Sequence, residues 1–247
     1  MISTSVLCVI PARMGSTRVP LKNIQHIDKD LTLVQQALSC CDGHSACIST
    51  DQPDYFSDYN TYIVSRPAAL SDSSALVSTA VQHALLDAEQ HYNRTFDIVA
   101  TLMPAIASRS KYIFSNMLTH FNAHPNLASS FSAAVTHPWV WKFSSDTSVA
   151  QNSWFPYPQK NSQDLPLYLV EHASIILNRR EVVLSGFKWL FPLSIHTLPS
   201  WSVGLDIDSA DDLYHARHLY PHMSQLLDKW QGSNLYLTNQ STFLPDM

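Results

Sequence analysis

The sequence has little charge and no excess of positive charge. Only 14% of its 247 residues are charged, and 15 basic against 20 acidic residues give a formal net charge of −5. Nucleic-acid-binding domains carry clustered basic residues, so this balance argues against a nucleic-acid partner. Disordered chains combine high charge with low hydrophobicity, and 45% hydrophobic residues exclude that class.

Long apolar runs are also lacking, since none approaches the roughly 20 residues that span a bilayer. The opening MISTSVLCVIPAR has no basic residue before its apolar stretch, and Arg13 stands where a cleavage site would need a small residue. We therefore expect no signal peptide, no membrane partner and a cytoplasmic location. Four cysteines without metal-ligand spacing are expected to be inert buried thiols in a reducing compartment: Cys8, Cys40, Cys41 and Cys47.

The length fits one globular domain, or a domain with a small appended lobe. No internal repeat or low-complexity linker divides the chain, so residues 1–247 are expected to form a single domain. Between about Thr136 and Gln163 the pattern breaks down into aromatic, proline and polar residues. We predict that 136–163 is either a small lobe or an arm that packs on another subunit.

Short apolar runs alternate with helical patterns along the rest of the chain. Strands are predicted over 6–11, 46–49, 61–64, 96–103, 127–135, 168–177 and 203–208, and helices over 31–41, 73–91 and 110–124. A last helix begins after Ser209, which can cap its free N–H groups, with Asp212 three residues on. The alternation predicts an α/β fold, with a mainly parallel sheet flanked by helices.

The most informative segment is the polar loop within residues 10–23, IPARMGSTRVPLKN, which follows the first predicted strand. Open α/β folds bind ligands at the carboxyl ends of their strands. Arg13, Arg18 and Lys22 can neutralise a polyphosphate, and Gly15 lets backbone N–H groups approach a phosphate. Neither GxxxxGK[ST] nor GxGxxG is present. A solvated surface loop with ordinary basic residues is the alternative.

A second candidate is the pair Asp206 and Asp208. Carboxylates two residues apart at the end of a strand point to the same side and can jointly hold Mg²⁺ together with substrate phosphate oxygens. The plainer alternative is a strand end followed by a helix cap. Combined with the cationic loop, the pair predicts a metal-assisted nucleotidyl-transfer site.

IPARMGSTRVPLKNI resembles the N-terminal signature of the cytidylyltransferases that activate acidic sugars. The resemblance is closest to the CMP-sialic acid (acylneuraminate) synthetase family, with its pseudaminate and legionaminate relatives. Four further blocks follow in the family's order and extend the resemblance over about residues 6 to 219: Ser49-Thr50-Asp51, Arg66-Pro67-Ala68-Ala69-Leu70 with Ser71-Asp72, Gln163-Asp164-Leu165-Pro166, and Asp206-Ile207-Asp208 leading into Asp211-Asp212-Leu213.

The resemblance implies a nucleotide-diphospho-sugar transferase fold of Rossmann-like architecture. It implies a reaction in which CTP and a nonulosonic acid, an acidic 2-keto sugar, give a CMP-sugar and pyrophosphate for lipopolysaccharide or capsule synthesis. It also suggests a homodimer, with the aromatic segment from Trp139 to Tyr157 as an exchanged arm.

By motif, the resemblance implies that Arg13 and Lys22 hold the triphosphate, and that Asp206 and Asp208 ligate Mg²⁺; these four residues form the expected catalytic set. Asn23 and Arg66 would position the cytidine. The wider nucleotide-binding set is Ala12, Arg13, Gly15, Ser16, Lys22, Asn23, Arg66, Asp72 and Ser73. The expected sugar-binding set is Met103, Lys142 and Gln163.

Three departures from the family pattern concern the sugar side. Leu102-Met103-Pro104-Ala105-Ile106-Ala107 stands where sialate synthetases typically read Leu-Gln-Pro-Thr-Ser-Pro, and Ser162 stands where they usually carry arginine. Ser16-Thr17-Arg18 with Pro20 is closer to the 3-deoxy-octulosonate cytidylyltransferases and to spore-coat polysaccharide proteins. The alternatives are therefore an octulosonate-type enzyme or a DxD glycosyltransferase of the same fold, and a catalytically weak nucleotide-binding or scaffold protein of the pathway.

Overall fold

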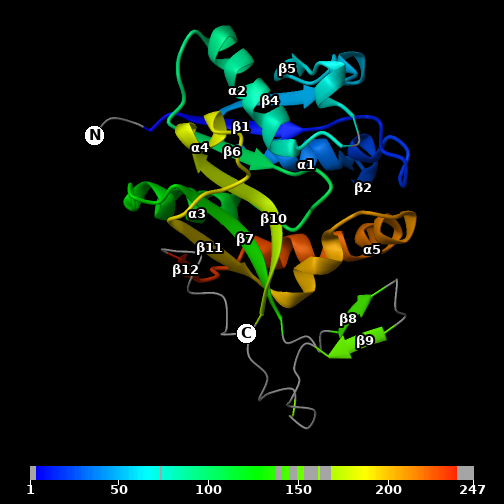
Figure 1. The fold of residues 1–247 in the computed structure, drawn as a ribbon. Coiled ribbons are helices and arrows are strands. Elements are labelled where there is room, and N and C mark those ends of the chain that lie inside the picture. Colours follow the sequence, from blue (N-terminus) through cyan, green and yellow to red (C-terminus); the bar gives the residue numbers. More distant parts are fainter. Residues whose placement is uncertain are drawn as a thin grey trace.

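The computed structural model describes residues 4–72, 74–136, 141–144, 149–152, 161 and 168–237. Its centre is an eight-stranded sheet in the order β12-β11-β7-β10-β6-β1-β4-β5 (Figure 1). The strands are β1 (Val6–Pro11), β4 (Ser45–Thr50), β5 (Tyr62–Ser65), β6 (Ile98–Leu102), β7 (Ser129–Thr136), β10 (Tyr168–Arg179), β11 (Leu193–Leu198) and β12 (Asn234–Leu237).

The sheet is mainly parallel, which confirms the predicted fold class. Strands β5, β4, β1 and β6 pair in parallel, and β11 pairs with β7 in parallel. Strand β10 is antiparallel to both β6 and β7, and β12 is antiparallel to β11. Parallel strands are usually covered on both faces, and all six residues of β1 are buried.

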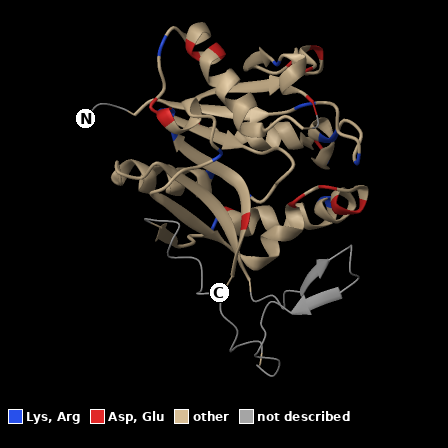
Figure 2. Ribbon diagram, in the orientation of Figure 1, with Lys and Arg blue, Asp and Glu red and all other residues tan. Residues whose placement is uncertain are grey.

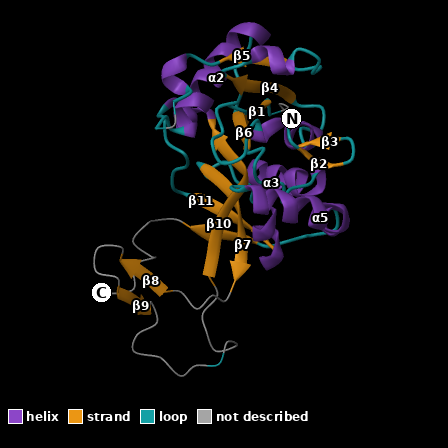
Figure 3. Ribbon diagram, turned by 90° about the vertical axis from the view of Figure 1, so that its right-hand side faces the viewer, coloured by secondary structure: helices purple, strands orange, loops and turns teal. Residues whose placement is uncertain are grey.

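Helices cover both faces of the sheet (Figure 3). The helices are α1 (Leu33–Ser39), α2 (Val77–Tyr92), α3 (Lys111–Ala123), α4 (Arg180–Leu184) and α5 (Ala210–Leu227). Cys8 and Ile10 of β1 belong to the apolar core that contains α1, α3 and α5, whereas Leu7 and Val9 pack with α2 and α4. The alternation of side chains along β1 thus builds two cores, one on each face.

The prediction of a strand over 203–208 is wrong. Ser200–Leu205 forms a 3-10 helix, and Asp206 makes only an isolated bridge with Ile106. Leu205 and Ile207 are fully buried, so the apolar residues of this segment reflect burial of a loop. Sequence reasoning also missed β11 and β12; in β11 the buried polar residues Ser194 and His196 interrupt the apolar pattern.

Other local predictions are confirmed, with shifted ends. Helix α2 begins at Val77 and not at residue 73. Ser209 caps α5 with a capping box that includes Asp212. All four cysteines are buried free thiols, and burial raises the pKa of the Cys40 thiol to about 11, as expected for an unreactive group. In the described part of the chain, no helix has the length and apolar character needed to cross a membrane.

Two small antiparallel pairs lie outside the main sheet. Strands β2 (His26–Asp28) and β3 (Leu31–Thr32) follow the first loop. Strands β8 (Trp141–Ser144) and β9 (Val149–Asn152) lie within the predicted lobe or arm over 136–163. They pair with each other and not with the main sheet. The rest of that segment falls largely outside the described residues, and its role as a subunit arm stays a prediction.

Candidate nucleotide-binding site

The polar loop leaves β1 at the carboxyl end of the sheet, where its backbone is fixed by two contacts. The buried Ala12 donates its N–H to the carbonyl oxygen of Ser49 at 2.8 Å. The Met14 N–H donates to Asp51 Oδ1, also at 2.8 Å. Both partners belong to the Ser49-Thr50-Asp51 block, so this block holds the loop in place.

Gly15 is exposed, and its position has room for a side chain. A Cβ there would meet no atom within 4 Å, and Gly15 lacks the positive φ that favours glycine. The protein itself therefore does not require glycine at this position. The remaining reason for a glycine is the one predicted from the sequence, namely that it lets the backbone approach a phosphate closely.

Lys22 connects this loop to the segment before α5. Its ammonium group donates to the carbonyl oxygen of Ile207 at 2.7 Å and lies 3.4 Å from Asp208 Oδ1. The same carboxylate oxygen is 2.8 Å from Arg18 Nη2. The Lys22 side chain is only 15% exposed, and the preceding Leu21 adopts a left-handed conformation with φ of 52°. The turn at Leu21 thus places a largely buried cation beside the acidic segment.

Asn23 and Arg66 are both buried and are held by main-chain groups. The Asn23 side-chain amide donates to the carbonyl oxygen of Arg13 at 2.7 Å. The Arg66 guanidinium donates to the Ser49 carbonyl oxygen at 2.8 Å and to Ser49 Oγ at 3.2 Å. Burial lowers the pKa of Arg66, while nearby Asp51 opposes this effect. A buried cation with donors held in fixed positions is suited to bind an anionic or carbonyl-bearing ligand.

A cleft of about 300 Å³ brings together residues from four segments of the chain. The first is the loop after β1, and the second is Arg66 with the residues that follow it. The third is the start of α2, and the fourth is the Met103–Ala105 stretch after β6. The lining includes eight of the predicted residues: Arg13, Ser16, Arg18, Lys22, Asn23, Arg66, Asp72 and Met103.

Other predicted residues do not line this cleft. Ala12 and Gly15 belong to the same loop but are absent from its wall. Asp206 and Asp208 lie just beyond it, reached through Lys22. Ser73 and Gln163 fall outside the described residues, and for Lys142 only the backbone, in β8, is described. The predicted grouping of sugar-binding residues therefore stays a prediction.

Asp206 lies close enough to Asp208 for its pKa to respond to the charge of that carboxylate. Burial, and then the charge of Asp208, raise the pKa of Asp206, and Lys22 partly offsets this effect. Asp206 makes no ion pair with the described residues, whereas Asp208 is paired with Arg18 and Lys22. Figure 2 colours the charged residues on the ribbon, and in it the acidic start of α5 and the first loop lie on the same side of the molecule.

The two carboxylates fit a divalent cation. Mg²⁺ in phosphate-processing sites is held by one or two carboxylates, with phosphate oxygens and water as further ligands. A cation between Asp206 and Asp208 would remove the repulsion that raises the pKa of Asp206. The described residues contain no cluster of three or more acidic, histidine or cysteine ligands, so a substrate would have to complete the coordination.

Sequence reasoning missed Arg109, which holds the loop after β6. Arg109 is fully buried, and its Nη1 donates to the carbonyl oxygens of Met103 and Ile106 at 2.6 Å and of Ser174 at 3.2 Å. The same loop bonds to the acidic segment, since Ala105 accepts from the Ile207 N–H at 2.9 Å. Arg109 had no sequence signal, because its partners are carbonyl oxygens that any residue carries.

A cationic cleft at the carboxyl ends of parallel strands, with two carboxylates beside it, is typical of α/β proteins of the nucleotidyltransferase type. Residues 7–228 match the family model described as cytidylyltransferase. The chain therefore belongs to the cytidylyltransferase family.

Solved structures with low sequence identity share the fold. One is CMP:2-keto-3-deoxy-manno-octonic acid synthetase complexed with CTP, with a TM-score of 0.61, 20% identity, and coverage of 91% of this chain and 100% of that chain. Another is 4-diphosphocytidyl-2C-methyl-D-erythritol synthase from Anaerococcus prevotii DSM 20548, with a TM-score of 0.54, 10% identity, and coverage of 89% and 99%. No curated protein matches the sequence.

Proposed function

We propose that the protein transfers CMP from CTP to the anomeric hydroxyl of a nonulosonic acid of the sialic, legionaminic or pseudaminic type. The hydroxyl oxygen forms a bond to the α-phosphorus, the bond from that phosphorus to the β-phosphate oxygen breaks, and pyrophosphate leaves. The hydroxyl gives up its proton to the solvent. The products are the CMP-sugar and pyrophosphate.

The observation that carries this proposal is the contact of Lys22 with both Ile207 and Asp208. It places a largely buried cation of the nucleotide cleft next to the acidic pair. In the proposal, Arg13 and Lys22 bind the triphosphate, while Asn23 and Arg66 position the cytidine. Positioning and neutralisation of charge supply most of the rate enhancement in phosphoryl transfer generally.

The proposal assigns Mg²⁺ to Asp206 and Asp208. When bound, the ion would neutralise charge that develops on the reacting phosphate. In the Arg18–Asp208 ion pair, the Arg18 side chain is 66% exposed and the Asp208 side chain is 53% exposed. Exposed ion pairs are weak, so Arg18 can exchange Asp208 for another anion. With a triphosphate in the cleft, Arg18 and Lys22 can exchange the carboxylate for phosphate oxygens, which leaves Asp208 to the cation.

An octulosonate-type cytidylyltransferase is the second candidate. The Ser16-Thr17-Arg18 stretch with Pro20 favours it, and so does the structural neighbour that makes a CMP-octonic acid and was solved with CTP. The two candidates share the nucleotide chemistry and differ in the acid that attacks.

Pyrophosphate release tests the proposal. The protein is mixed with CTP, Mg²⁺ and one acid at a time from a panel of sialic, legionaminic, pseudaminic and octulosonic acids. Release with a nonulosonic acid supports the proposal, and release with octulosonic acid alone supports the second candidate. Stabilisation by CTP without release for any acid points to the catalytically weak binding protein, since ligand binding stabilises a fold whether or not it reacts.

A further inference from the structure

A second cavity, of about 260 Å³, opens beside the cationic cleft and is apolar. It lies between α2, β6, β10 and α4, with walls that include Val81, Ile176 and Val183. We call it the apolar cavity. Its volume is a little below the roughly 300–1,000 Å³ of pockets that hold whole ligands. It therefore suits a part of a ligand whose remainder lies elsewhere.

The apolar cavity and the nucleotide cleft adjoin each other. Leu76, Val77 and Met103 line both of them. Ile106, also in the cavity wall, bridges to Asp206 through its backbone. A ligand in the apolar cavity would thus adjoin both the bound nucleotide and the acidic pair, which is the place for an acceptor that attacks the α-phosphorus.

The polar side chains of the apolar cavity are few, and two of them already have partners. Asn178 accepts from Ser129 Oγ at 2.7 Å and donates to the carbonyl oxygen of Lys188 at 3.0 Å. Lys188 itself pairs with Glu171 at 2.5 Å.

Among the described residues of the wall, the hydroxyls of Ser78 and Thr101 remain to bind a ligand. A chain of sugar hydroxyls would lose its hydrogen bonds to water there and regain few, which costs affinity.

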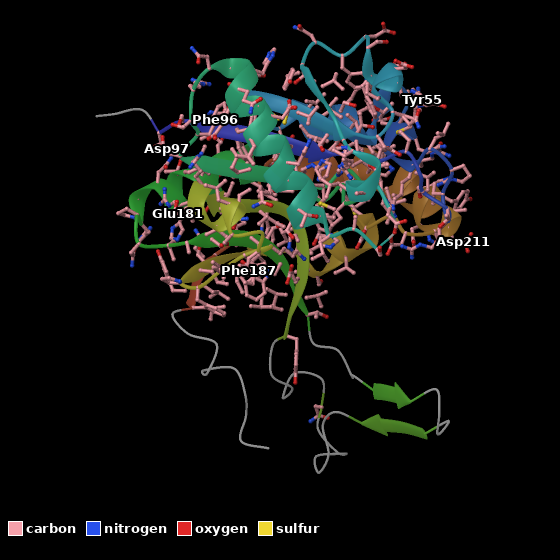
Figure 4. The ribbon with its side chains drawn as sticks, turned by 45° about the horizontal axis from the view of Figure 1, so that its top comes forward. Tyr55, Phe96, Asp97, Glu181, Phe187 and Asp211 are labelled. Carbon is pink, nitrogen blue, oxygen red and sulfur yellow. The ribbon has the colours of Figure 1, made fainter. Side chains whose placement is uncertain are left out.

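Large apolar side chains surround the mouth of the apolar cavity. Leu76 is 66% exposed, Val77 is 44% exposed and Phe187 is 58% exposed. Figure 4 labels Phe187 on the loop that follows α4. Exposed apolar side chains grouped around a cavity mark a surface that a ligand covers. Together with the apolar walls, they indicate a ligand group that is itself apolar.

We infer that the apolar cavity binds acyl and methyl substituents of the acceptor, so that the substrate is an acylated, deoxygenated acidic sugar and not a polyhydroxylated one. This inference rests on the proposed function. Met103 and Ile106, which line the apolar cavity, then fit the substrate, because an acyl methyl or a terminal methyl makes apolar contacts where a polyol would need polar partners.

Two nine-carbon acids of the same configuration test the inference. Legionaminic acid carries two acylamino groups and a terminal methyl, and 2-keto-3-deoxy-nononic acid carries hydroxyls at those three positions. We expect kcat/KM for pyrophosphate release to be at least about tenfold higher for legionaminic acid, since a single methylene is worth about 10- to 200-fold in such pockets. Equal values, or a preference for the polyhydroxylated acid, would overturn the inference and leave the proposed function intact.

A variant that fills the apolar cavity supplies the second test. Ser78 lines the cavity but not the cleft, so Ser78→Phe should lower kcat/KM for legionaminic acid at least about tenfold and keep the stabilisation by CTP. Gln90→Phe, at an exposed position on the same helix, is the matched control and should change neither. An unchanged kcat/KM in Ser78→Phe would contradict the inference.

If pyrophosphate is not released with any acid, the inference is tested by binding. Each acid is titrated calorimetrically into the protein in the presence of CTP. Tighter binding of legionaminic acid supports the inference. Absence of binding by either acid, with CTP still stabilising the chain, overturns it. If CTP does not stabilise the chain either, the proposed function fails and the inference fails with it.

Discussion

The ammonium group of Lys22 donates a hydrogen bond to the main-chain carbonyl oxygen of Ile207, at a distance of 2.7 Å. This bond joins the loop after the first strand to a segment 185 residues later in the chain. Asp206 and Asp208 flank Ile207, so one side chain connects the nucleotide cleft with the carboxylates assigned to Mg²⁺.

Replacing Lys22 with alanine should weaken CTP binding. Hydrogen bonds to charged groups contribute about 1.5–3 kcal/mol, so we expect the dissociation constant for CTP to rise by about one to two orders of magnitude. Isothermal titration with CTP measures it. Lys29→Ala, at an exposed position after β2, is the control and should bind CTP like the parent protein. An unaltered affinity in Lys22→Ala would remove Lys22 from the phosphate site.

Asp208→Asn should abolish turnover and keep the fold. The Asp208 side chain is 53% exposed, so its loss leaves the core intact, while an amide is a poor ligand for Mg²⁺. Pyrophosphate release and thermal unfolding are measured in parallel. Asp211→Asn, three residues further on at an exposed position, is the control and should retain turnover. Full activity in Asp208→Asn would contradict the assignment of the metal site.

Asp206→Asn should stabilise the fold near neutral pH. Burial and the charge of Asp208 raise the pKa of Asp206, so the folded chain retains this proton to higher pH than the unfolded chain. Above the folded pKa the ionised carboxylate therefore destabilises the fold, and the neutral amide removes this effect. The gain should disappear below about pH 4, the ordinary value for aspartate, where Asp206 is protonated in both states.

Urea unfolding of Asp206→Asn and the parent protein, from pH 3 to pH 8 without Mg²⁺, measures this difference. A variant that is less stable than the parent at pH 7 would show that the carboxylate is not under electrostatic strain.

Glu89→Gln should destabilise the fold at pH 7. The Arg180 guanidinium binds both carboxylate oxygens of Glu89, at 2.7 and 2.8 Å, and this hydrogen bonding holds the pKa of Glu89 below its ordinary value. Such stabilisation is present above the ordinary pKa of about 4.3 and is lost as the pH falls through the folded value. We expect a loss of about 1.5–3 kcal/mol at pH 7.

Chemical denaturation as a function of pH tests the Glu89 prediction, with Glu181→Gln, exposed and next to Arg180, as the control. The difference between parent and Glu89→Gln should shrink as the pH falls below about 4. A difference that does not depend on pH would mean that Glu89 acts by packing alone. The bond matters for the site because it ties α4 to α2, which form two walls of the apolar cavity.

The sequence predicted the strands that are buried on both faces, because their residues form continuous apolar runs. Residues 6–11 read as a parallel strand because every side chain is apolar, and β1 is buried throughout. The cap at Ser209 was predictable because it depends on residues three positions apart. Strand β11 could not be predicted in this way. Its buried Ser194 forms a hydrogen bond with Ser130 Oγ of a neighbouring strand, and the local sequence pattern does not reveal this partner.

The candidate site, too, could be predicted only in part. Arg13, Lys22 and Arg66 could be singled out as charged residues in recognisable blocks, and the structure brings them to one cleft. The apolar cavity could not be predicted, since Val81, Ile176 and Val183 read as ordinary core residues in three separate elements. Met103 was expected to bind the sugar and was also noted as a departure from a polar pattern, and the structure places it in the walls of both hollows.

The central claim is that CMP passes from CTP to the hydroxyl of an acidic sugar. Phosphorus NMR of the protein with CTP, Mg²⁺ and legionaminic acid tests it most directly, with the Asp208→Asn variant as the control. The account predicts a new phosphodiester resonance that grows in step with pyrophosphate, and no such resonance in the variant. CTP that binds but stays intact, or that is hydrolysed to free CMP, would contradict the account.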